Sequence, residues 1–370
     1  MRKESYLDEI LPPRHGGRVE EVSESRGIDP DELIDFSANT NPLAPPEELE
    51  ELIAGEIGSL RHYPDDRYEK FRKSVAGFLT DRLEMEIRPE SVIPGNGSVE
   101  VFRLILRLLA AEGAERVLIP FPTFSEYGLQ SRLFGLDVER KEYEKVLGLG
   151  ESELEDYDLV FLCNPNNPTG KLRPARRLAE FAARCREAEV FVVLDEAFIE
   201  LSDPGESLTG LVSERPNLGV VRSLTKEFTI PGLRVGYGVF SKELANRLEK
   251  LRPSWNLNRF ADLVGRRFLK EERELLHESR KYLARERDWL TEEIDGLGFS
   301  LYPSSTNFLL LDAEPVGRRA DKLVNRCLDH KVLIRNAHSF YGLDEWHVRV
   351  AVKRREENRK LVESLKGAIG

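Results

Sequence analysis

Ser223-Leu224-Thr225-Lys226, followed by Pro231-Gly232-Leu233-Arg234-Val235-Gly236, is the stretch of sequence that says most about the fold. Its lysine stands three residues after a serine and eight residues before an arginine. A lone lysine is usually a solvated surface group, but this one follows an apolar run, residues 218–223, typical of a buried strand. An amine at a strand end can form an imine with an aldehyde, while the hydroxyl and the guanidinium can hold a phosphate nearby. The stretch therefore predicts an α/β protein with a phosphorylated aldehyde cofactor at one edge of its sheet.

Short apolar runs alternate with amphipathic stretches through much of the chain. The expected strands are residues 91–94, 116–119, 158–163, 190–194, 218–223 and 235–240. Helical stretches, such as 99–111 and 174–188, lie between most of them. This alternation predicts a mostly parallel sheet that is covered by helices on both faces and binds its ligand at the carboxyl ends of its strands.

The pattern changes near Pro253. A charged helical stretch from about 259 to 296 precedes two short α/β units, with strands near 307–311, 332–335 and 348–352 and helices near 317–329 and 354–365. We expect a large cofactor-binding domain over residues 36–254 and a smaller α/β domain over residues 255–370. Residues 1–35 should form an N-terminal arm that packs with the smaller domain, and the proline-rich segment 41–46 should connect the two.

Composition excludes several classes of protein. A chain of 370 residues is too long for a single hydrophobic core of ordinary size. The net charge of −11 argues against broad nucleic-acid binding. No apolar run approaches the ~20 residues that a membrane helix needs. The cysteines, Cys163, Cys185 and Cys327, are far apart and odd in number, which is typical of reduced thiols in a cytoplasmic protein. The histidines show no metal-ligand spacing, so no metal site is expected.

Two polar residues stand at the ends of predicted strands. Asp195 follows the apolar run 190–194, and Asn167 lies in a turn, residues 164–170, directly after the strand 158–163. Each has an ordinary interpretation, Asp195 as a cap and Asn167 as part of a plain turn. At neighbouring strand ends, however, a carboxylate can keep a pyridine nitrogen protonated and an amide can donate to a phenolic oxygen.

The turn Gly95-Asn96-Gly97-Ser98-Val99-Glu100 joins a predicted strand to a predicted helix. Its glycines allow close approach of the backbone, and the first N–H groups of the helix attract a phosphate. It is not the dinucleotide-binding G-x-G-x-x-G, because Glu100 fills the third glycine position, and no G-K-[ST] follows to make a P-loop. A plain turn is the alternative interpretation.

In chain order, Asn167-Pro168-Thr169-Gly170, Asp195-Glu196-Ala197, Ser223-x-x-Lys226 and Arg234-x-Gly236 resemble the motifs of the fold-type I pyridoxal-phosphate (PLP) aminotransferases. The resemblance extends from about Asp35 to the C-terminus. It implies the fold of that family, a large domain with a mostly parallel sheet between helices plus a smaller α/β domain. It also implies pyridoxal 5′-phosphate as the cofactor.

The resemblance also implies roles for single residues. Lys226 would be the catalytic imine lysine, Asp195 the partner of the pyridine nitrogen and Asn167 the donor to the phenolic oxygen. The other residues expected to contact the cofactor within the same subunit are Ser98, Val99, Phe124, Ser223 and Arg234. Tyr63, in Tyr63-Pro64-Asp65, would reach the phosphate of a neighbouring subunit, which implies a homodimer with shared active sites.

Two branches of the family fit closely, the threonine-phosphate decarboxylases and the histidinol-phosphate aminotransferases. The decarboxylases are the nearer match in Arg14-His15-Gly16-Gly17, in the tail 341–358 and in Phe198, where aminotransferases usually carry a tyrosine that donates to the phenolic oxygen. Phe198 can equally be simple packing. The resemblance implies a lyase that converts L-threonine O-3-phosphate to aminopropanol phosphate in cobalamin biosynthesis. The alternatives are histidinol-phosphate aminotransferase, with 2-oxoglutarate as amino acceptor, and, more remotely, a non-catalytic PLP-binding regulator.

The substrate side of the expected site rests on arginines. In Val348-Arg349-Val350-Ala351-Val352 the valines share one strand face, and Arg349 lies on the other. A buried arginine needs an anionic partner, which is either a structural carboxylate or the substrate. By resemblance Arg349 binds the substrate anion, and the other substrate-binding residues expected are Arg335, Asn41 and His15. A small phosphorylated amino acid or amine would suit such a pocket.

Overall fold

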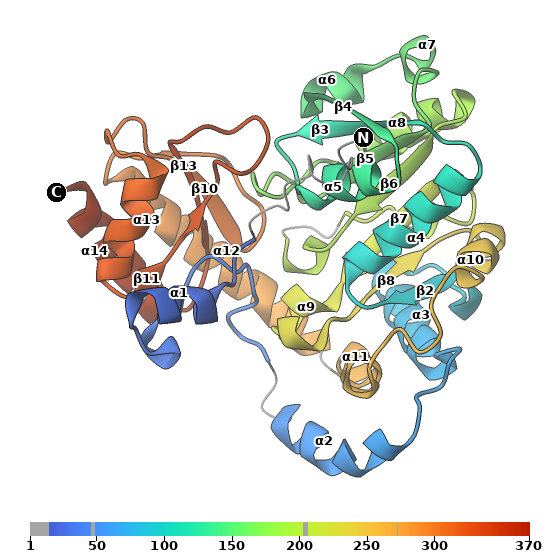
Figure 1. Cartoon of the computed structure of the whole chain (residues 1–370), viewed down its shortest axis with the longest axis horizontal. Helices are drawn as coiled ribbons and strands as arrows, with labels where there is room; N and C mark the ends of the chain where they lie inside the picture. The colour runs from blue at the N-terminus through green and yellow to red at the C-terminus, as the bar shows by residue number, and fades with distance from the viewer. Residues whose placement is uncertain (1–14, 46–48, 203–205, 272) are drawn as a thin grey trace, which may run out of the picture.

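A seven-stranded sheet forms the centre of the larger part of the molecule (Figure 1). The structure, a computed structural model, describes residues 15–45, 49–202, 206–271 and 273–370. In spatial order the strands are β2 (Val92–Gly95), β8 (Gly236–Val239), β7 (Leu218–Ser223), β6 (Phe191–Asp195), β5 (Leu159–Cys163), β3 (Arg116–Phe121) and β4 (Asp137–Glu142). Strands β7, β6, β5, β3 and β4 are parallel, and β8 runs antiparallel to β2 and β7. The predicted α/β class with a mostly parallel sheet is confirmed.

Helices cover both faces of this sheet because its central strands are apolar on both sides. All residues of β5, for example, are buried. The helices that pack on one face are α3 (Glu69–Leu83), α8 (Ala175–Glu187) and α11 (Arg259–Glu271), and those on the other are α4 (Ser98–Ala111), α5 (Glu126–Leu133) and α10 (Lys242–Glu249). The carboxyl ends of β5, β6 and β7 therefore remain open at one edge, where loops can carry functional side chains.

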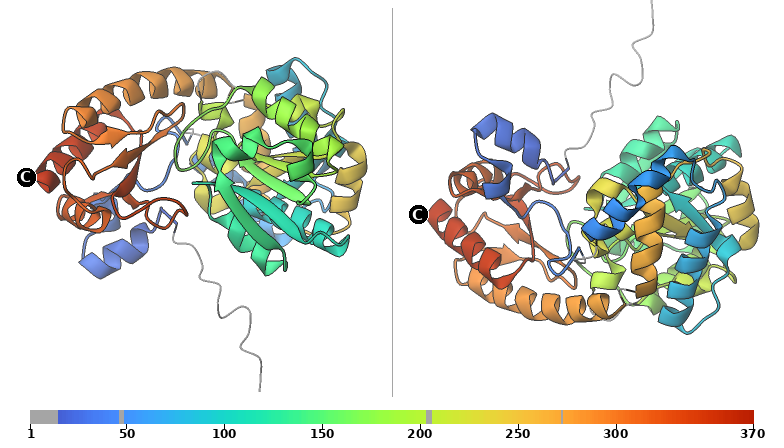
Figure 2. Two further views of the ribbon diagram at one scale, coloured as in Figure 1. Left: turned by 90° about the horizontal axis from the view of Figure 1, so that it is seen from above. Right: turned by 90° about the horizontal axis from the view of Figure 1, so that it is seen from below.

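The C-terminal part has a four-stranded antiparallel sheet in the order β12 (Arg335–Asn336), β13 (His347–Ala351), β10 (Phe308–Asp312) and β9 (Ser300–Leu301). Helix α12 (Arg273–Asp295) leads into it from the larger part, as Figure 2 shows, and α13 (Ala320–Asp329) packs on α14 (Arg355–Ile369). The N-terminal segment joins this part: β1 (Ile34–Asp35) pairs in parallel with β11 (Val332–Leu333), and α1 (Val19–Arg26) packs beside them.

Short elements complete the chain. The short α-helices are α2 (Leu49–Glu56), α6 (Tyr143–Gly148), α7 (Glu151–Leu154) and α9 (Leu224–Glu227). The 3-10 helices are η2 (Pro30–Glu32), η3 (Ile57–Arg61), η4 (Pro89–Ser91), η5 (Ile199–Leu201), η6 (Thr209–Leu211) and η7 (Pro231–Leu233). Within the described residues, no helix combines the length and the apolar character that crossing a membrane requires.

Some observed elements differ from the expected ones. The apolar pattern misses β4, because an edge strand that is only partly buried needs no apolar run. The helical stretch expected over 259–296 is divided into α11 and α12, and the strand expected over 332–335 is divided between β11 and β12, which belong to different sheets. The expected domain boundary after residue 254 falls in the loop between α10 and α11. Arg14 and Pro46 lie outside the described residues.

Candidate active site

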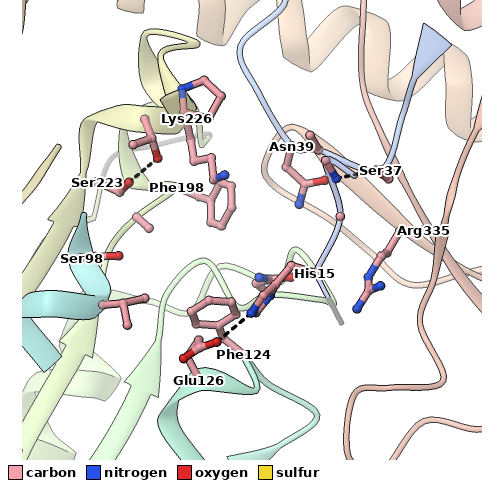
Figure 3. Close-up of a pocket in the computed structure, with 18 of the residues that line it drawn as sticks. His15, Ser37, Asn39, Ser98, Phe124, Glu126, Phe198, Ser223, Lys226 and Arg335 are labelled. Atoms are coloured by element: carbon pink, nitrogen blue, oxygen red, sulfur yellow. Dashed lines mark hydrogen bonds and ion pairs between the residues drawn. The ribbon is translucent and has the colours of Figure 1, made fainter. Parts of the chain in front are cut away.

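A cavity of about 670 Å³ lies where the carboxyl ends of the central strands face the N-terminal segment and the small sheet. One side, which we call the sheet wall, is formed by Ser98, Asp195, Ser223, Lys226 and Arg234. The opposite side, the strap wall, is formed by Ser37, Asn39, Arg335 and Arg349. Ser37 and Asn39 belong to a segment, residues 35–43, that we call the strap. Figure 3 shows the two walls facing each other, with the side chain of Lys226 directed into the space between them.

Lys226 lies on α9, the short helix that begins directly after β7. Burial lowers the pKa of its amine from 10.5 to about 8, and the positive charges of Arg349 and Arg234 act in the same direction. A lysine with a lowered pKa is partly unprotonated near neutral pH, and only the unprotonated amine is a nucleophile. The amine of Lys226 is therefore prepared for attack on a carbonyl group.

Asp195, the last residue of β6, accepts two hydrogen bonds from the protein. The hydroxyl of Tyr127 donates to its Oδ2 at 2.6 Å, and the N–H of Ala197 donates to its Oδ1 at 2.9 Å. Burial raises the pKa of Asp195 to about 6, although both hydrogen bonds oppose that rise. Within the part of the chain that the structure describes, no lysine, arginine or histidine pairs with this buried carboxylate, and a protonated ring nitrogen would supply a cationic partner.

Tyr127 is a residue that the sequence motifs do not reveal. Its ring stacks on that of Phe161, with centroids 4.8 Å apart, and meets Phe124 edge to face. Burial, together with the charge of Asp195, raises the pKa of Tyr127, so the hydroxyl remains a hydrogen-bond donor. The only signal in the sequence is that Tyr127 follows Phe124 by three residues, about one helical turn.

One corner of the sheet wall is built to hold an anion. Helix α4 begins there with Ser98, after Gly97. A Cβ on Gly97 would lie only 2.5 Å from Nη2 of Arg234, so the guanidinium packs directly against the glycine backbone. The hydroxyls of Ser223 and Thr225, which are 2.7 Å apart, also line the cavity. A helix start, a guanidinium and hydroxyl groups together suit a phosphate.

Asn167 and Phe124 line the middle of the cavity. The Oδ1 of Asn167 accepts a hydrogen bond from Nη1 of Arg349, which connects the loop after β5 with the strap wall. Phe124 lies near His15, with ring centroids 5.7 Å apart. Val99, the second residue of α4, also lines the cavity. The structure thus brings these predicted residues together, while their individual roles stay predictions.

Arg349 and Arg335 face the same cavity because they stand opposite each other in the register of β13 and β12. Arg349 is buried, and its hydrogen-bond acceptors are neutral oxygens, Oδ1 of Asn167 and the carbonyl of Ser37. Burial, together with the charge of Arg335, lowers the pKa of Arg349 to about 9, although the charge of Asp35 opposes this. Within the described residues no carboxylate lies within ion-pairing distance of Arg349. The structure therefore does not show the ion pair with a protein carboxylate that was the alternative to substrate binding.

His15 reaches the mouth of the cavity from the N-terminal segment. Its Nε2 lies 2.7 Å from Oε1 of Glu126, a residue that the sequence motifs do not reveal. Burial alone would raise the pKa of Glu126, but the hydrogen bonds from His15 and Gln130 outweigh it and lower that pKa. The side chain of His15 is 47% exposed, which suits a contact at the rim of a substrate site rather than in its centre.

Two predicted residues do not line the cavity. Asn41 is 1% exposed, and its side-chain nitrogen already donates to the carbonyl of Glu227 and to Oγ of Ser279, so it has no donor left for a substrate. Asn39, two residues earlier, takes the place in the cavity that the sequence analysis gave to Asn41. Tyr63 is 79% exposed and stacks on Trp255 with centroids 4.5 Å apart. Its contact with a neighbouring subunit stays a prediction.

The fold and the site together define a PLP-dependent enzyme: a lysine at a strand end, a carboxylate on the next strand and an anion corner beside them. The chain belongs to the aminotransferase class I and II family, which matches residues 31–365. Its cofactor is pyridoxal 5′-phosphate. The predicted fold-type I architecture is confirmed by solved structures of this family.

Relatives from both of the branches expected from the sequence are similar to this chain. The chain is 31% identical over 364 residues to "Threonine-phosphate decarboxylase" of Salmonella typhimurium, covering 96% of each chain. It is 32% identical over 378 residues to "Histidinol-phosphate aminotransferase" of Methanopyrus kandleri, covering 98% of this chain and 94% of the relative. The crystal structure of the histidinol-phosphate aminotransferase from Clostridium acetobutylicum has a TM-score of 0.81 at 30% identity, covering 91% of this chain and 99% of that one.

The residues present fit the cofactor of the family. The guanidinium of Arg234 lies against the glycine backbone at the start of α4, and this charge together with the first N–H groups of the helix suits a phosphate. The buried carboxylate of Asp195, at the carboxyl end of the neighbouring strand, suits a protonated ring nitrogen. Lys226, between these two features, supplies the amine that would hold the aldehyde group. When bound, the cofactor supplies an acceptor for the electrons of a bond broken at the α-carbon of the substrate.

Proposed function

We propose that this enzyme decarboxylates L-threonine O-3-phosphate to aminopropanol phosphate, a step of cobalamin biosynthesis. The observation that carries the proposal is the buried guanidinium of Arg349, whose hydrogen-bond acceptors among the described residues are neutral oxygens and which faces the cavity beside Arg335. A buried charge without a directly paired carboxylate is costly, so the site favours a ligand that brings negative charge with it. A substrate with a carboxylate and a phosphate on a short carbon chain would use both arginines.

Phe198 supports decarboxylation over transamination. Its ring is 5% exposed, lines the cavity and packs edge to face on Phe308, with centroids 5.1 Å apart. A tyrosine at this position would bring a hydroxyl into the cavity, whereas Phe198 brings none. Asn167 is then the main side-chain donor expected for the phenolic oxygen of the cofactor.

The strap wall would decide which bond of the substrate breaks. The bond that lies perpendicular to the cofactor ring breaks most easily, so the residues that hold the anionic groups choose between loss of CO₂ and loss of a proton. Arg349, fixed by Asn167 and Ser37, would hold one anionic group of the substrate in place. The amine of Lys226, with its lowered pKa, would return a proton to the α-carbon after CO₂ has left.

The second candidate is histidinol-phosphate aminotransferase with 2-oxoglutarate as amino acceptor. The similarity to the Methanopyrus kandleri relative favours it as much as the Salmonella typhimurium relative favours the decarboxylase. Its amine substrate carries a phosphate and an imidazole but no carboxylate and would use one of the two arginines, whereas the two carboxylates of 2-oxoglutarate would use both. The arginines therefore suit either reaction, and Phe198 is the residue that favours decarboxylation.

One assay with two readouts separates these candidates. The pure protein with added PLP is incubated with L-threonine O-3-phosphate, and separately with L-histidinol phosphate and 2-oxoglutarate. We expect CO₂ release from the first mixture and at most slow glutamate formation in the second. Fast glutamate formation without CO₂ release would show that the enzyme is the aminotransferase.

We further propose a cytoplasmic homodimer with shared active sites. Large apolar side chains are exposed around α2 and the loop before α11: Ile57, Leu60, Tyr63 and Trp255. Such a group of side chains favours a protein interface.

The cysteines support the cytoplasmic compartment, because all three are free and buried, as in proteins of reducing compartments. Sedimentation equilibrium should give twice the chain mass of 42.3 kDa, and Tyr63→Phe should weaken cofactor retention if Tyr63 serves the neighbouring subunit.

A further inference from the structure

Asn41 contacts the short helix that carries Lys226. Helix α9 has only four residues, so most of its carbonyl groups have no partner within the helix. The carbonyl of Leu224 accepts from the N–H of Phe228, and that of Thr225 accepts from the N–H of Ile230. The remaining two carbonyls, those of Lys226 and Glu227, depend on partners from another part of the chain.

Asn41 supplies both of those partners. Its backbone N–H donates to the carbonyl of Lys226 at 3.0 Å, and its Nδ2 donates to the carbonyl of Glu227 at 2.8 Å. The same Nδ2 donates to Oγ of Ser279 on α12 at 2.9 Å. The hydroxyl of Thr229, just after α9, donates to the carbonyl of Asn41 at 2.7 Å. One buried asparagine thus caps the end of α9 and fixes it to the helix that leads into the C-terminal part.

The strap extends this contact to the other side of the cavity. Its residues Asp35, Ser37 and Asn39 line the cavity, and the carbonyl of Ser37 accepts from Arg349. The strap therefore contacts Arg349 through Ser37 and contacts α9, the helix of Lys226, through Asn41. A displacement of α9 would move the amine of Lys226 relative to the charges that act on it, those of Arg349, Arg234 and Asp35.

We propose that Asn41 is a positioning residue, which caps the helix of Lys226 and sets the place of its amine relative to the strap wall. The proposal rests on Lys226 as the cofactor lysine and not on the choice between decarboxylation and transamination. It replaces the direct contact with substrate that the sequence had suggested for Asn41.

Asn41→Ala tests the proposal, with Ser279→Ala as the matched control. Both variants lose the hydrogen bond between this amide and Ser279, but only Asn41→Ala also loses the bonds of the side chain to the carbonyl of Glu227 and to the N–H of Leu43. The backbone bond from residue 41 to the carbonyl of Lys226 remains in both variants, so the test isolates the side-chain half of the cap. The readout is the rate at which cofactor-free protein takes up PLP, measured at a series of pH values. Uptake is monitored through the visible absorption band of bound PLP. In the unaltered protein the midpoint of this profile should lie near the lysine pKa of about 8.

With Asn41→Ala we expect the midpoint to move upward toward 10.5, because a less firmly held amine is less buried and lies farther from Arg349 and Arg234. We also expect PLP to dissociate about 10-fold faster, in line with the sensitivity of active sites to small displacements. Ser279→Ala should leave both values unchanged. A lower unfolding temperature of Asn41→Ala, with an unchanged midpoint and unchanged PLP dissociation, would overturn the proposal.

Thr229→Val is a second, milder variant in case Asn41→Ala folds poorly. It removes the hydroxyl that donates to the Asn41 carbonyl but keeps a β-branched side chain. We expect a smaller shift of the midpoint in the same direction, and Thr229→Ser, which keeps the donor, should restore it. A shift of equal size in Thr229→Ser would contradict the role of this hydrogen bond. Since neither readout uses a substrate, failure of the decarboxylase proposal leaves both results interpretable.

Discussion

The two walls of the cavity are built in different ways. Side chains of the sheet wall lie at strand ends or at the start of α4, so each belongs to a short local motif, as with Asp195 at the end of β6. The strap wall takes its residues from the strap and from two strands of the small antiparallel sheet. We infer that the sheet wall fixes the cofactor chemistry, whereas the strap wall selects the substrate and the bond that breaks.

The largest expected effect belongs to the sheet wall. Lys226→Ala should remove the visible absorption band of bound PLP and reduce turnover by roughly 10³-fold or more, because the only amine of this wall is lost. Lys226→Arg is the control, since it keeps the positive charge but supplies no comparable nucleophile. If Lys226→Arg turned over substrate nearly as fast as the unaltered enzyme, the amine of the sheet wall would not be needed for the cofactor chemistry, and the inferred difference between the walls would be wrong.

Asp195→Asn tests the sheet wall through stability. The pKa of Asp195 in the folded, cofactor-free protein is raised from 3.8 to about 6, so its ionisation favours unfolding. Its stabilising contribution is complete below pH 3.8 and is lost as the pH rises through 6. An asparagine cannot ionise, so the stability of cofactor-free Asp195→Asn relative to the unaltered protein should increase by about 3 kcal/mol as the pH rises from below 3.8 to above 6.

Denaturant unfolding at pH 5 and pH 8 checks this prediction. The free energy of unfolding of Asp195→Asn relative to that of the unaltered protein should be larger at pH 8 than at pH 5. It should decrease as the pH falls toward the ordinary pKa of an aspartate, 3.8. A difference between the two proteins that does not change with pH would mean that Asp195 is not a buried, uncompensated carboxylate in the cofactor-free protein.

Arg349→Lys tests the strap wall. A lysine keeps the charge but loses the forked donor that contacts Asn167 and Ser37, so we expect kcat/KM to fall roughly 10²-fold. The visible band and the retention of PLP should change little, because a lysine keeps the positive charge that acts on the amine of Lys226. Arg335→Lys should show a smaller loss of the same kind. Loss of the visible band in Arg349→Lys would show that the two walls do not act separately.

The smallest expected effect is a change in the ratio of transamination to decarboxylation. Phe198→Tyr adds a hydroxyl to a side chain that packs on Phe308, so the fold should tolerate it. We expect the ratio of transamination to decarboxylation to rise by a few-fold, measured as glutamate formed per CO₂ released with 2-oxoglutarate present. An unchanged ratio would make Phe198 a packing residue without influence on the reaction.

The difference between the walls also explains what the sequence could predict. Lys226, Asp195 and Asn167 were found because each follows an apolar strand, and Arg234 was found because it stands eight residues after Lys226 and just before the apolar strand β8. Arg349 was found because it interrupts an alternating apolar strand. These signals are local, and a strand end carries its residue to the same edge of the sheet in any such fold.

Residues placed by tertiary contacts were not predictable in this way. Asn39 and Asn41 stand in the same segment, and only the pairing of β1 with β11 and the packing of the strap decide which of them faces the cavity. Tyr127 and Glu126 lie on α5, and their contacts with Asp195 and His15 join residues that are far apart in the sequence. No local pattern encodes such contacts.

Reduction of the PLP-loaded protein with borohydride, followed by peptide mapping, identifies the lysine that holds the cofactor. We expect a single stable cofactor modification on the peptide that contains Lys226, and none in Lys226→Ala. A modification at another lysine, or no modification in protein that has taken up PLP, would contradict this expectation.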